Sequence, residues 1–183
     1  MNLARQHPEV YAAYLEELRG NFRGKILVLP GRTMSRTREG VAAVDEAIRF
    51  LRRARPLAPF AFSSGMSRAA AEHAADQAGG AFGHRGSDRS NPSERMSRHG
   101  IWSGAWGENI SYGKASARDV VLALIIDDGL RGRKHRKNIF NPAFHYAGAA
   151  VGSHARYRTV CSIDFAGGYV EGAADASSLF ARN

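Results

Sequence analysis

Five ionisable side chains near the middle of the chain could do chemistry together: His84, Glu108, Asp127, Asp128 and His135. They recur beside glycines, near tryptophans or close to predicted helix ends, where loop backbone can present a side chain to a site. Two imidazoles and two carboxylates suit a borderline divalent cation such as Zn²⁺, or a general acid and base that work without metal. The sequence has no His-Glu-x-x-His helix, Cys pair or EF-hand loop, so only the fold can bring these residues together.

Each of the five also has a purely structural interpretation. His84 could hydrogen-bond within a loop, and Glu108 could cap a loop or a helix. Asp127 and Asp128 could be solvated at a helix end, although a carboxylate there faces the unfavourable end of the helix dipole. His135 could be one more member of the basic run over residues 131–137, which we interpret as a solvated face.

Three other reactive side chains are predicted to be structural. His73 lies in an alanine-rich helical stretch and His154 ends a predicted strand, so we expect both to be hydrogen-bonded within the fold. Cys161 alternates with Ile163 and Phe165, which places it in the core rather than in a nucleophilic site. The Gly-x-Ser-x-Gly turn of many serine hydrolases is absent.

Composition restricts the class of protein. The 183 residues, 44% hydrophobic and 23% charged, can form one core, and no apolar run is long enough to cross a bilayer. One cysteine excludes an internal disulfide. A net charge of +9 favours anionic partners such as acidic lipid or cell-envelope polymers, although it would also serve solubility. Only Phe140 lies near the basic run for base stacking, so we do not expect nucleic acid.

Hydrophobic periodicity predicts the elements that must position these side chains. Four segments have helical spacing or helix-start signals: residues 9–19, 39–53, 67–77, and a stretch that opens at Ser116 and runs to Gly129. Residues 146–154 and 159–165 alternate, so they should pair antiparallel around a turn. Residues 84–113 are so polar and glycine-rich that we predict a long structured loop, within which Trp102 and Trp106 are buried and hold Glu108.

Several segments together resemble a bacterial member of the CAP superfamily, which comprises cysteine-rich secretory proteins, antigen five and plant pathogenesis-related proteins. The resemblance covers about residues 37–169. The segments that carry it are HRGSDRS at 84–90, GENIS at 107–111, DDG at 127–129, HRKNIFNP at 135–142 and SIDFAGG at 162–168.

The resemblance implies an α+β fold, a three-layer α-β-α sandwich with a small antiparallel sheet. It also implies a cleft that contains two histidines and two acidic residues. His84 and His135 stand at the histidine positions and are the implied metal ligands, and Glu108 stands at the position of the first acidic residue. The second acid is usually a glutamate near the end of the helix before the second histidine. Asp128 stands at that position here, with Asp127 as the alternative. We expect an N-terminal helix and extension over residues 1–36, the CAP domain over 37–171 and a tail over 172–183.

The resemblance also implies a function. Members are mostly secreted, some bind divalent cations at the cleft histidines, and some are associated with lipids, but no shared reaction is established. Residues 1–10 lack the plan of a secretory signal, so the protein is either cytoplasmic or had a leader that is missing from this sequence. By analogy with the family we expect the second, an extracellular or periplasmic protein. We expect a binding protein rather than an enzyme, with Zn²⁺ or another divalent cation in the cleft and a lipid or anionic cell-envelope ligand. The alternative is a metal-dependent, peptidase-like hydrolase with Glu108 or Asp128 as general base.

Overall fold

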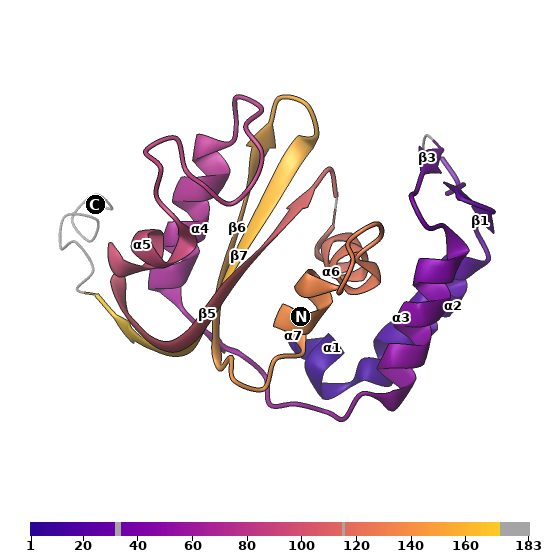
Figure 1. Ribbon diagram of the computed structural model, residues 1–183, viewed down its shortest axis with the longest axis horizontal. Coiled ribbons are helices and arrows are strands. Elements are labelled where there is room, and N and C mark those ends of the chain that lie inside the picture. Colours follow the sequence, from indigo (N-terminus) through magenta and orange to yellow (C-terminus); the bar gives the residue numbers. More distant parts are fainter. Residues whose placement is uncertain (32–33, 115, 173–183) are drawn as a thin grey trace, which may run out of the picture.

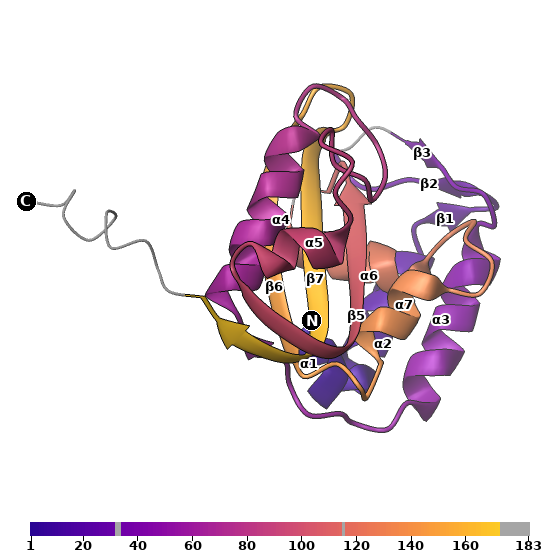
Figure 2. The same cartoon turned by 60° about the vertical axis from the view of Figure 1, so that its left-hand side comes forward.

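The computed structural model describes residues 1–31, 34–114 and 116–172, and these form three layers (Figures 1 and 2). A four-stranded sheet lies in the middle. One of its faces is covered by α4 (Ser64–Asp76) and α5 (Pro92–Ser97), as Figure 1 shows on the left. The helices on the other side are α1 (Asn2–Gln6), α2 (Pro8–Arg19), α3 (Val41–Arg53), α6 (Ala117–Ile126) and α7 (Lys134–Ile139). The predicted α-β-α sandwich is confirmed.

The central sheet has the strand order β4-β6-β7-β5. Its strands are β4 (Ala61–Phe62), β5 (Gly100–Tyr112), β6 (Tyr146–His154) and β7 (Arg158–Glu171). β7 pairs antiparallel with both β5 and β6, whereas β4 pairs parallel with β6. The predicted antiparallel pair is therefore confirmed, and β5 is an edge strand. A second, small antiparallel sheet contains β1 (Phe22–Arg23), β2 (Ile26–Leu27) and β3 (Ser35–Arg36).

The prediction of a long loop over residues 84–113 is wrong, because this stretch contains α5 and the whole of β5. Asn91 and Glu94 form a reciprocal capping box that starts α5. β5 pairs with β7 along its length, with an irregularity between Ser103 and Trp106. Glu108 and Asn109 are tolerated in this strand because their buried side chains have hydrogen-bond partners from other elements. Trp106 is 40% exposed, so its predicted burial is also wrong.

The four predicted helices are confirmed as α2, α3, α4 and α6, with ends that move by up to three residues. At the start of α6, the Ser116 hydroxyl accepts a hydrogen bond from the Asp119 N–H, as the capping signal predicted. α6 ends at Asp127, whose backbone is left-handed with φ of 55°. None of the helices in the described ranges is long and apolar enough to span a bilayer.

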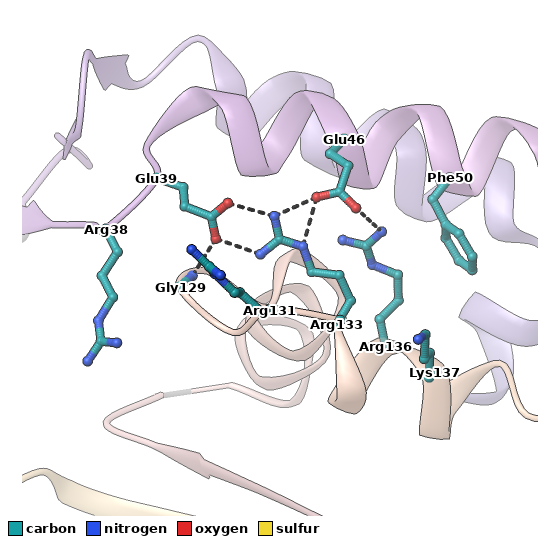
Figure 3. Close-up of a pocket in the computed structure, with 10 residues that line it drawn as sticks. Arg38, Glu39, Glu46, Phe50, Gly129, Arg131, Arg133, Arg136 and Lys137 are labelled. Atoms are coloured by element: carbon teal, nitrogen blue, oxygen red, sulfur yellow. Dashed lines mark hydrogen bonds and ion pairs between the residues drawn. The ribbon is translucent and has the colours of Figure 1, made fainter.

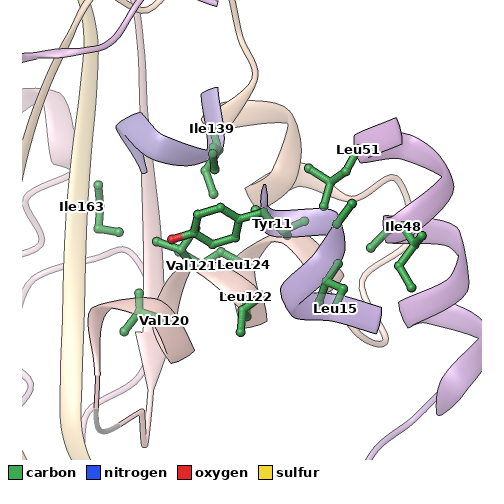
Figure 4. Close-up of a cluster of buried hydrophobic side chains, with 14 of the residues drawn as sticks. Tyr11, Leu15, Ile48, Leu51, Val120, Val121, Leu122, Leu124, Ile139 and Ile163 are labelled. Atoms are coloured by element: carbon green, nitrogen blue, oxygen red, sulfur yellow. The ribbon is translucent and has the colours of Figure 1, made fainter. Parts of the chain in front are cut away.

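The main hydrophobic cluster extends from β7 past α6 to α2 and α3, so it continues into the helical layer (Figure 4). On β7, Cys161, Ile163 and Phe165 all face this cluster, so the predicted core position of Cys161 is confirmed. Burial raises the pKa of the Cys161 thiol to about 11. This thiol is therefore protonated at neutral pH and is a poor nucleophile.

A buried arginine ties the N-terminal helices to the rest of the fold. Arg5 is 2% exposed, and its guanidinium donates to the carbonyl oxygens of Ala58, Ile139, Asn141 and Phe144 at 2.7–3.3 Å. Ala58 lies before β4, Ile139 is the last residue of α7, and the other two acceptors lie between α7 and β6. In addition, Ala4 of α1 and Tyr11, Ala12 and Leu15 of α2 belong to the buried hydrophobic cluster. Residues 173–183 of the predicted tail lie outside the described residues.

Candidate functional site

Glu108 is the centre of a buried polar cluster between β5 and the α4/α5 layer. Its side chain is 1% exposed, and Oε1 lies 2.7 Å from Nδ1 of His84. Oε2 accepts from Nη2 of Arg95 at 2.8 Å and from the Ser162 hydroxyl at 2.9 Å. Arg95, itself only 2% exposed, supplies the charge that a buried carboxylate needs. Arg95 and Ser162, rather than the two tryptophans, hold Glu108 in place.

The backbone beside His84 is held on both sides. The Gly83 carbonyl accepts from Nε2 of Gln77 at 2.5 Å and lies 2.9 Å from Nε2 of His73. The Gly83 N–H donates to the Tyr112 hydroxyl at 3.1 Å. His73 is 1% exposed and burial lowers its pKa, which keeps it neutral. His73 therefore has the structural role that we predicted, and it helps to position His84.

His135 and Asp127 form a second pair of the same kind. Nδ1 of His135 lies 2.7 Å from Oδ1 of Asp127, and the His135 N–H donates to Oδ2 at 2.9 Å. The Asp127 side chain is 1% exposed and the His135 side chain 19%. The left-handed backbone of Asp127 turns the chain at the end of α6, so that one carboxylate meets both groups on His135.

Asp128 lies elsewhere. Its carboxylate accepts from the N–H groups of Arg38 and Glu39 at 2.7 and 2.8 Å, just before α3. These bonds connect the end of α6 to the start of α3. Of the two adjacent aspartates, Asp127 is the one in contact with a histidine.

Both pairs are connected to the edge strand β5. Glu108 and Asn109 are successive residues of this strand, so their side chains project from opposite faces. The Asn109 amide donates to the His135 carbonyl at 3.0 Å, and Asn138 donates to Asn109 at 2.8 Å. The structure thus brings together four of the five predicted residues as two histidine–carboxylate pairs, one on each side of β5.

The model of the cysteine-rich secretory protein family, CAP, matches residues 46–165. This chain belongs to the CAP family. The matched region contains both histidine–carboxylate pairs and the four strands of the central sheet, apart from the end of β7. The match therefore agrees with the resemblance seen in the sequence.

Comparison with curated proteins gives no match, whereas several solved structures are similar. An outer surface protein from Borrelia burgdorferi has 16% identity and a TM-score of 0.49, over 60% of this chain and 78% of that one. An extracellular protein with an SCP domain from Bacillus anthracis has 20% identity and a TM-score of 0.45, over 69% of this chain and 37% of its own. A cysteine-rich secretory protein from Staphylococcus aureus has 12% identity and a TM-score of 0.43, over 70% and 38%. This CAP chain spans little more than a third of the length of the last two proteins.

The chemistry of each of these two histidines in the CAP chain suits a metal ligand. Each Nδ1 faces a buried carboxylate, so it carries the proton and leaves the Nε2 lone pair free. Neither Nε2, of His84 or of His135, has a hydrogen-bond partner within the described ranges. No group of three or more His, Cys, Asp or Glu side chains in these ranges is arranged to hold a metal. Water or a ligand would therefore have to supply the remaining positions.

Asp164 is a further buried acid beside the site, which the sequence analysis did not single out. It stands opposite Glu108 in the β5–β7 register, is fully buried, and neither of its oxygens has a hydrogen-bond partner in the described residues. Burial and the neighbouring Glu108 charge hold its pKa well above the usual range, despite Arg95. On its other side Gly148 lets α4 close over the sheet, since a side chain there would clash with α4. These surroundings therefore favour the neutral form of the Asp164 carboxyl over the ionised form.

A signal for this polar cluster was present in the sequence. Ser162 and Asp164 alternate with Ile163 and Phe165, so in a strand they must face the opposite side of the sheet from the hydrophobic core. Two polar residues at the centre of a buried strand indicate that the second face also packs against something polar. Arg95 carried no comparable signal, since nothing local distinguishes it from the other arginines.

Proposed function

We propose that this CAP chain is a binding domain in which Nε2 of His84 and Nε2 of His135 hold a divalent cation, Zn²⁺ or a similar ion. The observation that carries the proposal is the repeated arrangement of a histidine whose Nδ1 lies 2.7 Å from a carboxylate that is 1% exposed. A carboxylate behind a histidine fixes the tautomer and the ring orientation and makes Nε2 more basic, which is how proteins prepare a metal ligand.

Binding is a better description of this site than hydrolysis. The hydrolase alternative uses Glu108 or Asp128 as its general base, and such a base needs a carboxylate oxygen that is free to take a proton from water. Both oxygens of Glu108 are engaged, one of them by the Arg95 guanidinium. Asp128, the other candidate base, is bonded to backbone N–H groups before α3. Hydrolysis of a casein substrate that stops when EDTA is added would reverse this preference.

We further propose that the domain acts outside the cytoplasm on a lipid or an anionic cell-envelope ligand. The secretory character in the family's name and the net charge of +9 support this, since a strongly basic protein attracts anionic surfaces. Co-sedimentation with purified envelope fragments, in low and in high salt, tests it. Equal recovery of protein with and without envelope would contradict it.

Zinc binding is the direct test of the cation site. Calorimetric titration at pH 7.5 should show binding to the wild type and none to the His84→Ala/His135→Ala variant, because the variant lacks both proposed protein ligands. Lowering the pH to 5.5 should weaken wild-type binding, since protons and metal compete for the same imidazole nitrogens. Identical titrations for the two proteins would refute the proposal.

Replacing the two adjacent aspartates by asparagine separates their roles. Asp127→Asn removes the charge behind His135 and should weaken zinc binding by roughly 10- to 100-fold. Asn tolerates the left-handed backbone at this position, so the fold should survive. Asp128→Asn is the matched control and should leave zinc affinity unchanged, because its carboxylate contacts no histidine. The opposite result would assign the second acid to Asp128.

A further inference from the structure

A pocket of about 840 Å³ opens between α3 and the segment that runs from Gly129 into α7 (Figure 3). It is lined by five basic side chains, two carboxylates, two glycines and Phe50. Neither His84 nor His135 lines it. The pocket is therefore separate from the proposed cation site and raises the question of what its charges do.

Both carboxylates of the pocket are already neutralised by arginines. Arg133 donates to Glu39 through Nη1 and Nη2 at 2.6 and 2.7 Å, and to Glu46 through Nε at 2.7 Å. Arg136, only 3% exposed, reaches Glu46 at 3.2 Å. The Arg133 guanidinium lowers the pKa of Glu39 to about 2, so this acid is ionised at neutral pH. The basic run is thus not a uniformly solvated face.

The remaining three basic side chains of the pocket have no such partner. Arg38, Arg131 and Lys137 are exposed, and no side-chain hydrogen bond or ion pair to them is found within residues 1–31, 34–114 and 116–172. Five cations against two carboxylates leave three positive charges around one concave surface. Charges of one sign in a cleft concentrate anionic ligands.

The walls of the pocket are preformed. Asp128 holds the residues before α3, and the Gly129 N–H donates to Glu39 at 2.6 Å. The Arg136 guanidinium lies 5.0 Å from the ring centroid of Phe50, and its Nε donates to the Ile125 carbonyl at 2.6 Å. A ligand would meet a surface already ordered by these contacts, which lowers the entropic cost of binding.

We propose that this pocket binds a phosphorylated ligand that carries at least two negative charges. Arg and Lys are the side chains that proteins use for phosphate oxygens, and three unpaired cations exceed what one carboxylate would neutralise. The pocket has the size of a small-molecule site, and Phe50 adds apolar surface beside the charges. A lipid head group and a soluble phosphorylated molecule share this chemistry. The proposal is independent of the cation site.

Inorganic pyrophosphate is the probe, because it carries the phosphate groups common to both kinds of ligand. Its binding to the protein is measured by calorimetry in the absence of metal. The test variant is Arg131→Gln/Lys137→Gln, whose side chains are exposed and make no bond that the fold needs. The matched control is Lys134→Gln, which is exposed on the same helix but does not line the pocket. Wild type should bind one pyrophosphate, the double variant at least about tenfold more weakly, and the control within about twofold of wild type.

Vesicles of phosphatidylcholine with phosphatidic acid distinguish a lipid head group from a soluble phosphorylated ligand. Co-sedimentation that pyrophosphate displaces identifies a lipid head group, and no co-sedimentation with intact pyrophosphate binding identifies a soluble ligand. The proposal is overturned if wild type does not bind pyrophosphate. It is also overturned if Lys134→Gln weakens binding as much as the double variant, since the attraction would then be diffuse. Zinc titration of the double variant should match wild type, so failure here leaves the cation site untouched.

Discussion

Replacing Arg95 by Met should destabilise the protein by about 3–5 kcal/mol, because it leaves the Glu108 carboxylate buried without its cation. The two side chains are 2% and 1% exposed and their bond is 2.8 Å long, so water cannot take the place of the lost guanidinium. Arg95 also donates to the carbonyls of His84 and Ser90 at 3.2 and 3.0 Å, which the variant leaves unsatisfied. Urea unfolding at pH 7 measures the change in free energy.

Two further variants test whether buried charge is the cause. Adding Glu108→Gln to Arg95→Met removes the unpaired charge and should recover part of the lost stability. Arg98→Met removes a neighbouring arginine whose side chain is 44% exposed and pairs with Asp88 and Glu72. Because water screens these pairs, its cost should stay below about 1 kcal/mol. An Arg95→Met cost no larger than that of Arg98→Met would contradict the assignment.

Asp164→Asn should change how stability depends on pH. Asp164 has a pKa well above its usual range in the folded protein, because of burial and the neighbouring Glu108 charge. The folded state therefore keeps a proton that the unfolded chain releases above about pH 4. From there up to the folded-state pKa, wild type should lose up to about 1.4 kcal/mol per pH unit relative to the variant. Urea unfolding of both proteins from pH 4 to 8 measures the difference.

Asp76→Asn is a control for which the pH dependence of stability, relative to wild type, should have the opposite sign. Hydrogen bonds from Ser87 lower the pKa of Asp76 below its usual range, so its stabilising contribution is present at neutral pH and is lost as the pH falls through the folded-state pKa. The wild-type advantage over Asp76→Asn should therefore shrink in acid, whereas that over Asp164→Asn should grow. Parallel stability curves for wild type and Asp164→Asn would show that Asp164 is ionised in the folded state.

Local patterns predicted the elements whose interactions are local. The helices α2, α3, α4 and α6 follow from apolar spacing and end signals within one segment, and the pair β6–β7 follows from alternation on both sides of a short turn. β5 escaped prediction because its polar residues are stabilised from elsewhere. Glu108 is hydrogen-bonded by Arg95, 13 residues away in the sequence, and by Ser162, 54 residues away. Contacts over such separations produce no periodic pattern in the sequence.

The sequence by itself determined the family and the residue types of the candidate site: two histidines and their acids, in segments whose order and content are specific. Only the tertiary structure decided which acid serves which histidine. Asp127 and Asp128 are chemically identical neighbours, and the left-handed turn at the end of α6 directs one to His135 and the other to the N–H groups before α3. In the same way, Glu39 and Glu46 select which cations of the basic run are neutralised, across separations of about 90 residues. Composition specifies the charges present, but pairing depends on distances that only the folded chain creates.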